Sequence, residues 1–362
     1  MQECVRDDFR VRNDGSGGSG SRSGGRALMA RVALLSNPRS TGNRSLLPRI
    51  RTFCAEHQDI FHYEVEHVDQ IGQALKTIAR VKPKVLVING GDGTVQAALT
   101  ELHSGGHFGD PEQGAGPPPV AVLPNGKTNL IAHDLGADGD PIEALERVLE
   151  IARSDMATHI VSRELIQLSG GMPGAKPVLG MFLGGAGLAD SILYCRHKLY
   201  PLGIPNWLAH VLTFVATLLT MVLGVTARFL PPRPQHVKIS ILKRGELQGK
   251  FALLMVTTLQ RLLLETNMPG SGPGPDGGRV GAMQLIVIER SPLALIRALV
   301  AAIRGRLGRY RMTGVHLERG DEIRIEGEHS SVILDGELFE GDADHPIVLR
   351  PTRPVPFLRL AA

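Results

Sequence analysis

The segment that most constrains the fold is an apolar run that ends in glycines. Val85 to Ile88 has the composition of a strand buried on both faces, and Asn89-Gly90-Gly91-Asp92-Gly93-Thr94 follows it directly. A helical pattern begins near Val95, with Thr94 placed to cap it. A strand, a glycine loop and a helix in this order predict an α/β unit whose helix N-terminus can face phosphate.

Asp92 in this loop has two interpretations. A plain βα turn would use glycine for its backbone freedom and aspartate for hydrogen bonds to its own backbone. Three glycines in one strand-to-helix loop favour a phosphate site instead. The loop has neither the Gly-Lys-Ser/Thr of a Walker A sequence nor the spacing of a dinucleotide fingerprint, so phosphate would be held in another way.

Two further predicted strands end in similar polar loops. "VALLSNPRSTGNR" ends its strand in Asn37 and Pro38, and "AVLPNGKTNL" places Gly126 and Thr128 before a helix. The carboxyl ends of neighbouring parallel strands meet at one edge of a sheet, so the three loops should form one crevice. We therefore predict a polyphosphate site there, with positive charge from Arg39, Arg44 and Lys127.

The pattern of elements changes along the chain. Residues 29–157 alternate short apolar runs with helical patterns, which predicts an α/β domain with an open, mostly parallel sheet. Residues 158–345 are short strands separated by glycine and proline, which predicts a mainly antiparallel β domain. Residues 1–28 are rich in glycine, serine and charge, so we expect a disordered extension, with Met29 as an alternative start.

Composition limits the classes of partner that the protein is expected to bind. The formal net charge is +4, only 4% of residues are aromatic and no nucleic-acid-binding motif is recognisable, so we expect no nucleic acid partner. The arginines are enriched in the C-terminal half, which an anionic membrane surface would explain. The three cysteines have neither disulfide nor metal spacing, which favours a reducing cytoplasm.

Two segments of the second domain interrupt its strand pattern. Residues 207–230 are long and apolar enough to be weighed as a membrane span, although threonines, a histidine and a glycine favour a buried or membrane-touching helix. The second segment, "SPLALIRALVAAIRGRLGRYRM", combines an apolar face with several arginines. It is either an ordinary surface helix or a basic helix that contacts anionic lipid.

Four motifs in order resemble those of the diacylglycerol kinase catalytic-domain family, which includes bacterial lipid kinases, diacylglycerol kinases, sphingosine kinases and ceramide kinases. The motifs are Asn37-Pro38-x-Ser40, Asn89 to Thr94, Pro124 to Gly136, and Asp335-Gly336-Glu337. The resemblance implies an N-terminal nucleotide-binding α/β domain and a C-terminal β-sandwich that holds the lipid site. It also implies that the tail, 346–362, returns to the first domain.

The resemblance implies roles for single residues. Asp92 would hold Mg²⁺ or orient the acceptor hydroxyl, and Glu337 would be the base that takes its proton, although sphingosine-kinase-like members are read with the aspartate as base. Asp190 would bind the lipid substrate, unless it only caps a helix. A hairpin turn also explains Asp335-Gly336. The residues that would hold ATP are Asn37, Pro38, Ser40, Gly90, Gly91, Gly93, Thr94, Gly126, Lys127, Thr128, Asn129 and Asp335.

The chain departs from the family pattern at two places. Leu130 stands where the family usually has an aspartate after Gly-Thr-x-Asn, and Lys127 is gained, which could contact phosphate directly. Val280 and Gln284 stand where bacterial members have the carboxylates of a structural Mg²⁺ site, so we expect that ion to be missing.

The sequence thus predicts an ATP- and Mg²⁺-dependent lipid kinase that phosphorylates the primary hydroxyl of a two-chain lipid, with a slight preference for ceramide or sphingoid lipids over diacylglycerol. We expect the protein to lie in the cytoplasm, peripherally bound to the inner face of a membrane. The sequence leaves open whether it forms a homodimer. Two alternatives remain: a nicotinamide dinucleotide kinase or phosphofructokinase-like enzyme, and a catalytically inactive lipid-binding regulator.

Overall fold

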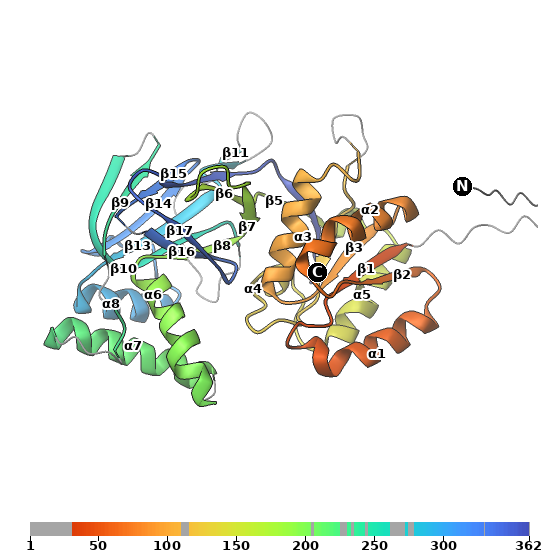
Figure 1. Cartoon of the computed structure of the whole chain (residues 1–362), viewed down its shortest axis with the longest axis horizontal. Coiled ribbons are helices and arrows are strands. Elements are labelled where there is room, and N and C mark those ends of the chain that lie inside the picture. The colour runs from red at the N-terminus through yellow and green to blue at the C-terminus, as the bar shows by residue number, and fades with distance from the viewer. Residues whose placement is uncertain are drawn as a thin grey trace, which may run out of the picture.

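Two domains lie side by side in the computed structural model of the chain (Figure 1). The structure describes residues 31–109, 116–203, 206–224, 230–232, 235–242, 245–260, 272–273, 279–328 and 330–361. The predicted disordered extension, residues 1–28, lies outside this range.

The first domain is built on a six-stranded sheet in the order β2-β1-β3-β4-β19-β5. Its first four strands run parallel, and β1 and β3 are fully buried, as their apolar composition predicts. They are β1 (Val32–Ser36), β2 (Ile60–Glu64), β3 (Val85–Asn89) and β4 (Val120–Val122). The helices that alternate with them are α1 (Asn43–Glu56), α2 (Ile71–Val81), α3 (Asp92–Ser104), α4 (Leu130–Asp134) and α5 (Pro141–Arg153). The predicted parallel α/β fold is confirmed.

The last two strands of this sheet come from distant parts of the chain. β19 (Val355–Leu358) lies parallel to β4, and β5 (Ile160–Arg163) is antiparallel to β19. The C-terminal tail thus adds a strand to the first sheet. β5 extends that sheet beyond residue 157, where the sequence pattern changes.

The second domain is an antiparallel sheet of eleven strands. Its longest strand, β10, pairs with β9 through its first half and with β8 and β13 through its second half, so the sheet folds around one apolar core. The strands are β6 (Ile166–Gly170), β7 (Val178–Gly180), β8 (Phe182–Gly185), β9 (His236–Ile241), β10 (Gly245–Thr257), β13 (Met283–Glu289), β14 (Val315–Gly320), β15 (Ile323–Glu326), β16 (Ser330–Leu334), β17 (Glu337–Gly341) and β18 (Ile347–Pro351). A separate short pair consists of β11 (Gly272–Pro273) and β12 (Arg279–Val280). The predicted antiparallel domain is confirmed.

Three helices cover one side of the second domain (Figure 1). α6 (Gly187–Tyr194) continues through a π-helical turn, η4 (Cys195–Leu199), and a short 3-10 turn, η5 (Tyr200–Leu202), toward α7 (Asn206–Leu223). α8 (Pro292–Ile303) packs on β13 and on α7. Within the described ranges, no helix has both the length and the apolar character that crossing a bilayer requires. The side chain of Trp207 is outside the described residues.

Candidate functional site

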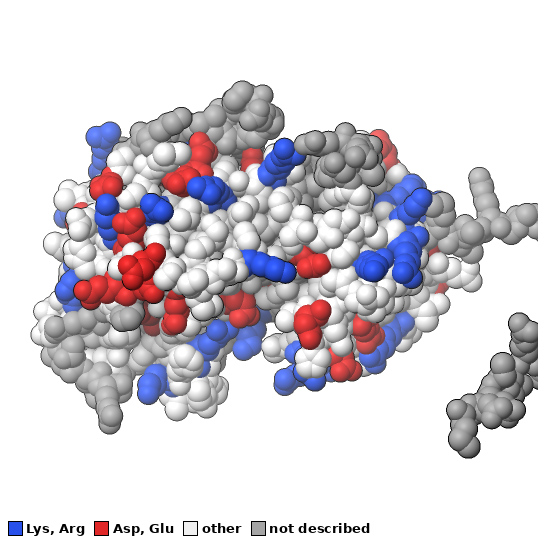
Figure 2. All heavy atoms as spheres, turned by 45° about the horizontal axis from the view of Figure 1, so that its top comes forward, with Lys and Arg blue, Asp and Glu red and all other residues white. Residues whose placement is uncertain are grey.

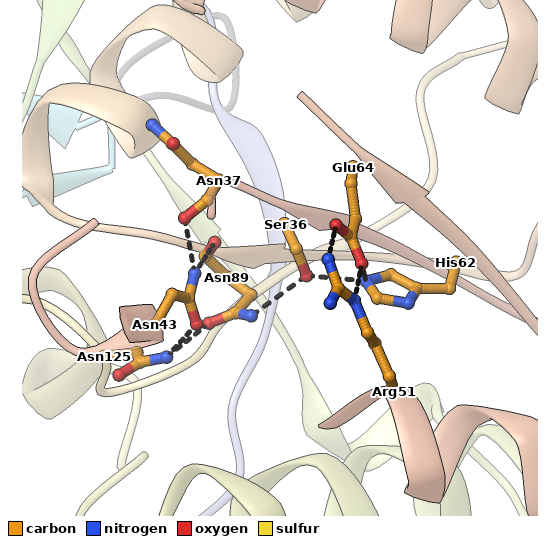
Figure 3. A network of polar contacts seen from close by, with 8 residues as sticks. All are labelled: Ser36, Asn37, Asn43, Arg51, His62, Glu64, Asn89 and Asn125. Atoms are coloured by element: carbon orange, nitrogen blue, oxygen red, sulfur yellow. Dashed lines mark hydrogen bonds and ion pairs between the residues drawn. The ribbon is translucent and has the colours of Figure 1, made fainter. Parts of the chain in front are cut away.

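Buried amide side chains join the ends of β1, β3 and β4 (Figure 3). Asn43, at the start of α1, donates from Nδ2 to the backbone oxygens of Asn37 (2.7 Å) and Asn89 (3.1 Å). Asn125 donates to Oδ1 of Asn89 (2.8 Å) and to Oδ1 of Asn43. Asn89 in turn donates to Ser36 Oγ (2.9 Å). These hydrogen bonds hold the three predicted loops together at one edge of the sheet.

Asn43 is a residue that sequence reasoning missed. It is 1% exposed, and its amide connects loops that follow two different strands. An asparagine at the start of a helix usually signals only a cap, and the cap position here is Gly42. A useful signal is the repetition of asparagine at or just after the ends of three strands that are neighbours in the sheet, at Asn37, Asn89 and Asn125.

The glycine loop begins α3 earlier than the sequence predicts. The helix starts at Asp92 with Gly91 as its N-cap residue, so Thr94 lies inside the first turn and is not its cap. Thr94 instead accepts a hydrogen bond from Nδ2 of Asn37 on its hydroxyl (2.9 Å). An N-cap residue is itself non-helical, whereas Thr94 follows Asp92 and Gly93 inside the helix.

The loops approach one another closely where glycines meet. A methyl group on Gly126 would lie 3.1 Å from the Cα of Gly91, and one on Gly91 would lie 3.5 Å from Oγ of Ser40. Ser40 donates to the backbone oxygen of Asn125 (3.3 Å), and half-buried Pro38 lies in the same loop. The backbones of the three loops are therefore near enough to one another to surround a single ligand.

Asp92 is half-buried at the N-terminus of α3. Burial raises the pKa of its carboxyl group, and a hydrogen bond with the Thr128 side chain opposes that rise. Asn129, with a left-handed φ of +54°, accepts from the backbone N–H of Gly126 (2.6 Å) and fixes the loop that carries Thr128. The third motif therefore supports Asp92 directly.

Leu130, at the position where the family has an aspartate, begins α4 and packs partly buried against the core of the first domain.

The fourth motif reaches this site from the second domain. Asp335 (φ +45°) and Gly336 (φ +95°) form the two-residue turn between β16 and β17, so the hairpin interpretation of this sequence is also confirmed. The turn places Glu337 against the glycine loop: a methyl group on Gly93 would lie 2.7 Å from Oε1 of Glu337. Gln96 on α3 donates to the backbone oxygen of Leu334 (2.7 Å), which fixes the turn to the first domain.

Asp335 lies inside this junction. Its two carboxylate oxygens accept hydrogen bonds from the backbone N–H groups of Met181 and Phe182, each at 2.9 Å. Burial raises the pKa of Asp335 to about 7 against these hydrogen bonds, and the negative charge of Asp92 adds to the rise. The carboxylate thus serves the structure of the turn, beside the two residues predicted to be catalytic.

The segment between α6 and α7 also contacts both halves of the site. Arg196, in η4, donates to the backbone oxygen of Gly336 (3.1 Å). The ammonium group of Lys127 lies over the ring of Tyr200, 5.6 Å from its centroid, which is a cation–π contact. Neither Arg196 nor Tyr200 was predicted from the sequence, because Arg196 meets Gly336 from 140 residues away and Tyr200 meets Lys127 only where the two domains come together.

Asp190 lies elsewhere in the second domain. It lies in the first turn of α6, and the N-cap residue of that helix is Ala186, so the helix-cap alternative is wrong. Burial raises the pKa of Asp190 to about 6. It lines a small cavity with Ala186, Gln235, Val237, Ile325, Ser330 and Ser331. Ser330 begins β16, whereas the turn at Asp335 and Gly336 follows its end, about 13 Å away at the usual rise of a strand.

The domain family follows from a comparison with known proteins. The model of the diacylglycerol kinase catalytic domain matches residues 31–159, which carry the first three motifs. These residues belong to the diacylglycerol kinase catalytic domain family. The diacylglycerol kinase domain of this chain therefore includes the asparagine network, the glycine loop and Asp92. No curated protein sequence matches the chain.

Solved structures extend the likeness to both domains. The structure of a diacylglycerol kinase from Bacillus anthracis str. Sterne has a TM-score of 0.53 and 15% identity, with coverage of 91% of this chain and 97% of its own. A second solved structure, also assigned to the diacylglycerol kinases of that organism, has a TM-score of 0.57 and 18% identity, with coverage of 90% and 94%. At such low identity the likeness establishes the two-domain fold, in which the diacylglycerol kinase domain is followed by the antiparallel domain.

Gly93→Ala tests the contact between the glycine loop and Glu337. The added methyl group would displace the Glu337 carboxylate, which is the end of a flexible side chain, so the fold should survive. We expect kcat to fall about 10-fold or more, because small displacements of a reacting group are costly. Gly249→Ala is the matched control, since its nearest contact would be an ordinary 3.7 Å. Equal kcat in Gly93→Ala and the wild type would mean that Glu337 is not needed where the structure places it.

Proposed function

We propose that the chain is an ATP-dependent lipid kinase that transfers the γ-phosphate of ATP to the primary hydroxyl of a two-chain lipid. The match to the diacylglycerol kinase domain supports a lipid kinase in general. The observation that carries the proposal is the contact between the domains, where Glu337 of the second domain meets Gly93, next to Asp92. Phosphoryl transfer needs a proton acceptor beside a phosphate-binding loop, and this junction provides one.

The proposed reaction assigns each step to a residue. The lipid hydroxyl oxygen forms a bond to the γ-phosphorus, and the bond from that phosphorus to the bridging oxygen of ADP breaks, with ADP keeping the electron pair. Glu337 accepts the hydroxyl proton. The backbone N–H groups at Gly91 and Gly93, together with Lys127, hold the phosphates in place.

Asp92 fits a role in binding magnesium together with the nucleotide. Mg²⁺ in phosphoryl-transfer sites usually binds one or two carboxylates and the substrate phosphates, and it neutralises charge on the transferred group. Within the described part of the chain, no group of three His, Cys, Asp or Glu side chains could hold a metal on its own. Asp92 would therefore complete a site that the phosphates of ATP largely form.

Asp190 is the residue we propose for lipid selection. Its cavity includes Ser330, whose buried hydroxyl oxygen has no hydrogen-bond partner. A half-buried carboxyl group beside hydroxyls suits a lipid that offers a hydroxyl or an amide N–H away from the reacting oxygen. This supports our slight preference for ceramide or a sphingoid lipid over diacylglycerol. On this proposal the enzyme acts from the cytoplasm at the inner face of a membrane.

Incubation with γ-labelled ATP and mixed vesicles that contain diacylglycerol, ceramide and sphingosine, each in a separate reaction, tests this function. We expect label in the organic phase, strongest with ceramide or sphingosine. Label only in an aqueous product formed from a soluble acceptor would support a nicotinamide dinucleotide kinase or phosphofructokinase-like enzyme. No labelled product despite vesicle binding would support an inactive regulator, an outcome for which Leu130 in place of the family carboxylate is a physical reason. Clear preference for diacylglycerol would overturn the lipid assignment alone.

A further inference from the structure

α7 and α8 each have two apolar sides. One side of α7 packs through Phe214, Leu218 and Met221 into a small core that includes Leu295 and Ala298 of α8. The other side is exposed to solvent on both helices. The exposed residues are Val211, Leu212, Val215, Leu219, Val222 and Leu223 of α7, and Leu293, Ile296, Leu299, Val300 and Ile303 of α8.

The spacing of these side chains makes each set a continuous stripe. On α7, Val211, Val215 and Leu219 are four residues apart, and on α8 the spacing of three and four residues relates Leu293, Ile296 and Val300. Leu219 is 49% exposed and Ile303 is 70% exposed. The two helices that carry the stripes pack on each other. We call these exposed residues together the α7–α8 face. Contiguous exposed apolar surface of this kind usually marks an interaction site.

Along α7, α8 and the segments that flank them the charge has one sign, while Glu289 and Glu318 line a nearby cavity together with Arg309 and Arg311. Residues 191–245 and 290–317 contain no aspartate or glutamate. The second of these stretches carries exposed Arg297, Arg304, Arg306, Arg309 and Arg311, and none of the five forms an ion pair with any side chain that the structure describes. By contrast, lysine and arginine are mixed with aspartate and glutamate on the face of the molecule in Figure 2.

We propose that the α7–α8 face docks on an anionic lipid bilayer, with both helices lying in the plane of its surface. An apolar stripe beside unpaired arginines is the pattern of interfacial helices, in which the apolar side chains enter the acyl boundary and the cations meet anionic headgroups. A bilayer with anionic headgroups fits both the apolar stripes of α7 and α8 and the positive charge carried by α8 and the residues after it. A protein partner would more often offer polar groups to pair with the exposed rim of the face.

Vesicle sedimentation without ATP and without any kinase substrate tests this proposal separately from the proposed function. The wild-type protein is expected to bind vesicles of phosphatidylcholine with phosphatidylglycerol, to bind phosphatidylcholine vesicles more weakly, and to lose affinity for the anionic vesicles as salt rises. Absence of binding to the anionic vesicles would overturn the proposal, even if the protein phosphorylates lipid in detergent micelles.

Charge substitutions test which residues provide the electrostatic part of vesicle binding. The triple variant Arg304→Gln, Arg306→Gln, Arg309→Gln should partition onto anionic vesicles on the order of 10²-fold less than the wild type. The triple variant Lys76→Gln, Arg80→Gln, Lys84→Gln makes the same charge change on exposed residues of the first domain and should bind like the wild type. Equal losses in the two triple variants would mean that only net charge matters, which would contradict a defined face.

Substitutions of exposed apolar residues test which part of the α7–α8 face enters the bilayer. Leu219→Asp and Ile303→Asp should each weaken vesicle binding about 10-fold or more, because each removes exposed apolar area that would enter the bilayer. Val68→Asp is the control, since Val68 is 54% exposed in the first domain. All three sites are open to solvent, so circular dichroism melts should be unchanged. Unchanged vesicle binding with loss of a dimer in analytical ultracentrifugation would show that the face is a protein interface and would overturn the proposal.

Discussion

Replacing Asp92 by asparagine is expected to abolish turnover, with a loss in kcat on the order of 10³ or more, while the protein stays folded. Asp92 is the carboxylate at the glycine loop, and Glu337 of the other domain meets the same loop. Asparagine keeps the size of the side chain and its hydrogen bond with Thr128 but removes the negative charge that would bind Mg²⁺. Steady-state kinetics at saturating ATP and lipid measure the effect.

The stability of the Asp92→Asn variant separates chemistry from folding. Because burial raises the pKa of Asp92, the folded protein holds the carboxyl proton more tightly than the unfolded chain does. The charged form at neutral pH therefore lowers the free energy of unfolding, and asparagine, which stays neutral, should leave the melting temperature equal or slightly higher. Asp69→Asn, at an exposed position of the same domain, is the matched control and should change neither quantity. Full activity in Asp92→Asn would remove Asp92 from the site.

Replacing Glu337 by glutamine is expected to lower kcat on the order of 10² or more if this residue is the base. Glutamine has nearly the same shape, so it can occupy the position beside Gly93, yet its amide cannot accept the hydroxyl proton. Stopped-time assays with excess lipid measure kcat for the variant and the wild type.

A control on the same strand makes the result for Glu337 specific. Glu340 is also exposed on β17, three residues further from the turn, so Glu340→Gln should leave kcat and KM near their wild-type values. A rise in KM for lipid with unchanged kcat in Glu337→Gln would move Glu337 from proton transfer to substrate binding. Asp92 would then be the stronger candidate for the base.

Much of the fold could be predicted because it depends on continuous runs of apolar residues. Val32 to Leu35 and Val85 to Ile88 are entirely apolar and entirely buried, so the parallel strands were visible in the sequence. The start of β10 was not visible, since most residues from Gly245 to Lys250 are exposed and only Leu247 among them is apolar, so this part is defined by its pairing with β9. The place of β19 in the first sheet was expected only through the family resemblance, because four residues carry too little pattern to identify their partner strand.

The candidate site was predictable to the extent that it lies in local motifs. The loops that follow β1, β3 and β4 meet at one edge, as parallel strands require. The roles of Asn43 and Arg196 depend on hydrogen bonds to residues far along the chain, and nothing in their own surroundings in the sequence reports those partners. The misplaced cap at Thr94 has a local cause, because the helix already includes Asp92 and Gly93.

The short connection from Arg196 to Leu202 has a thermodynamic consequence. It contacts the carbonyl of Gly336 and the ammonium group of Lys127, and the chain then continues into α7, which is part of the α7–α8 face. If contact with a bilayer changes the geometry of this connection, it changes the affinity for nucleotide by some factor, and linkage requires that nucleotide change the affinity for the bilayer by the same factor. The same coupling free energy could then be measured in two ways: as the effect of vesicles on nucleotide affinity, or as the effect of nucleotide on vesicle affinity.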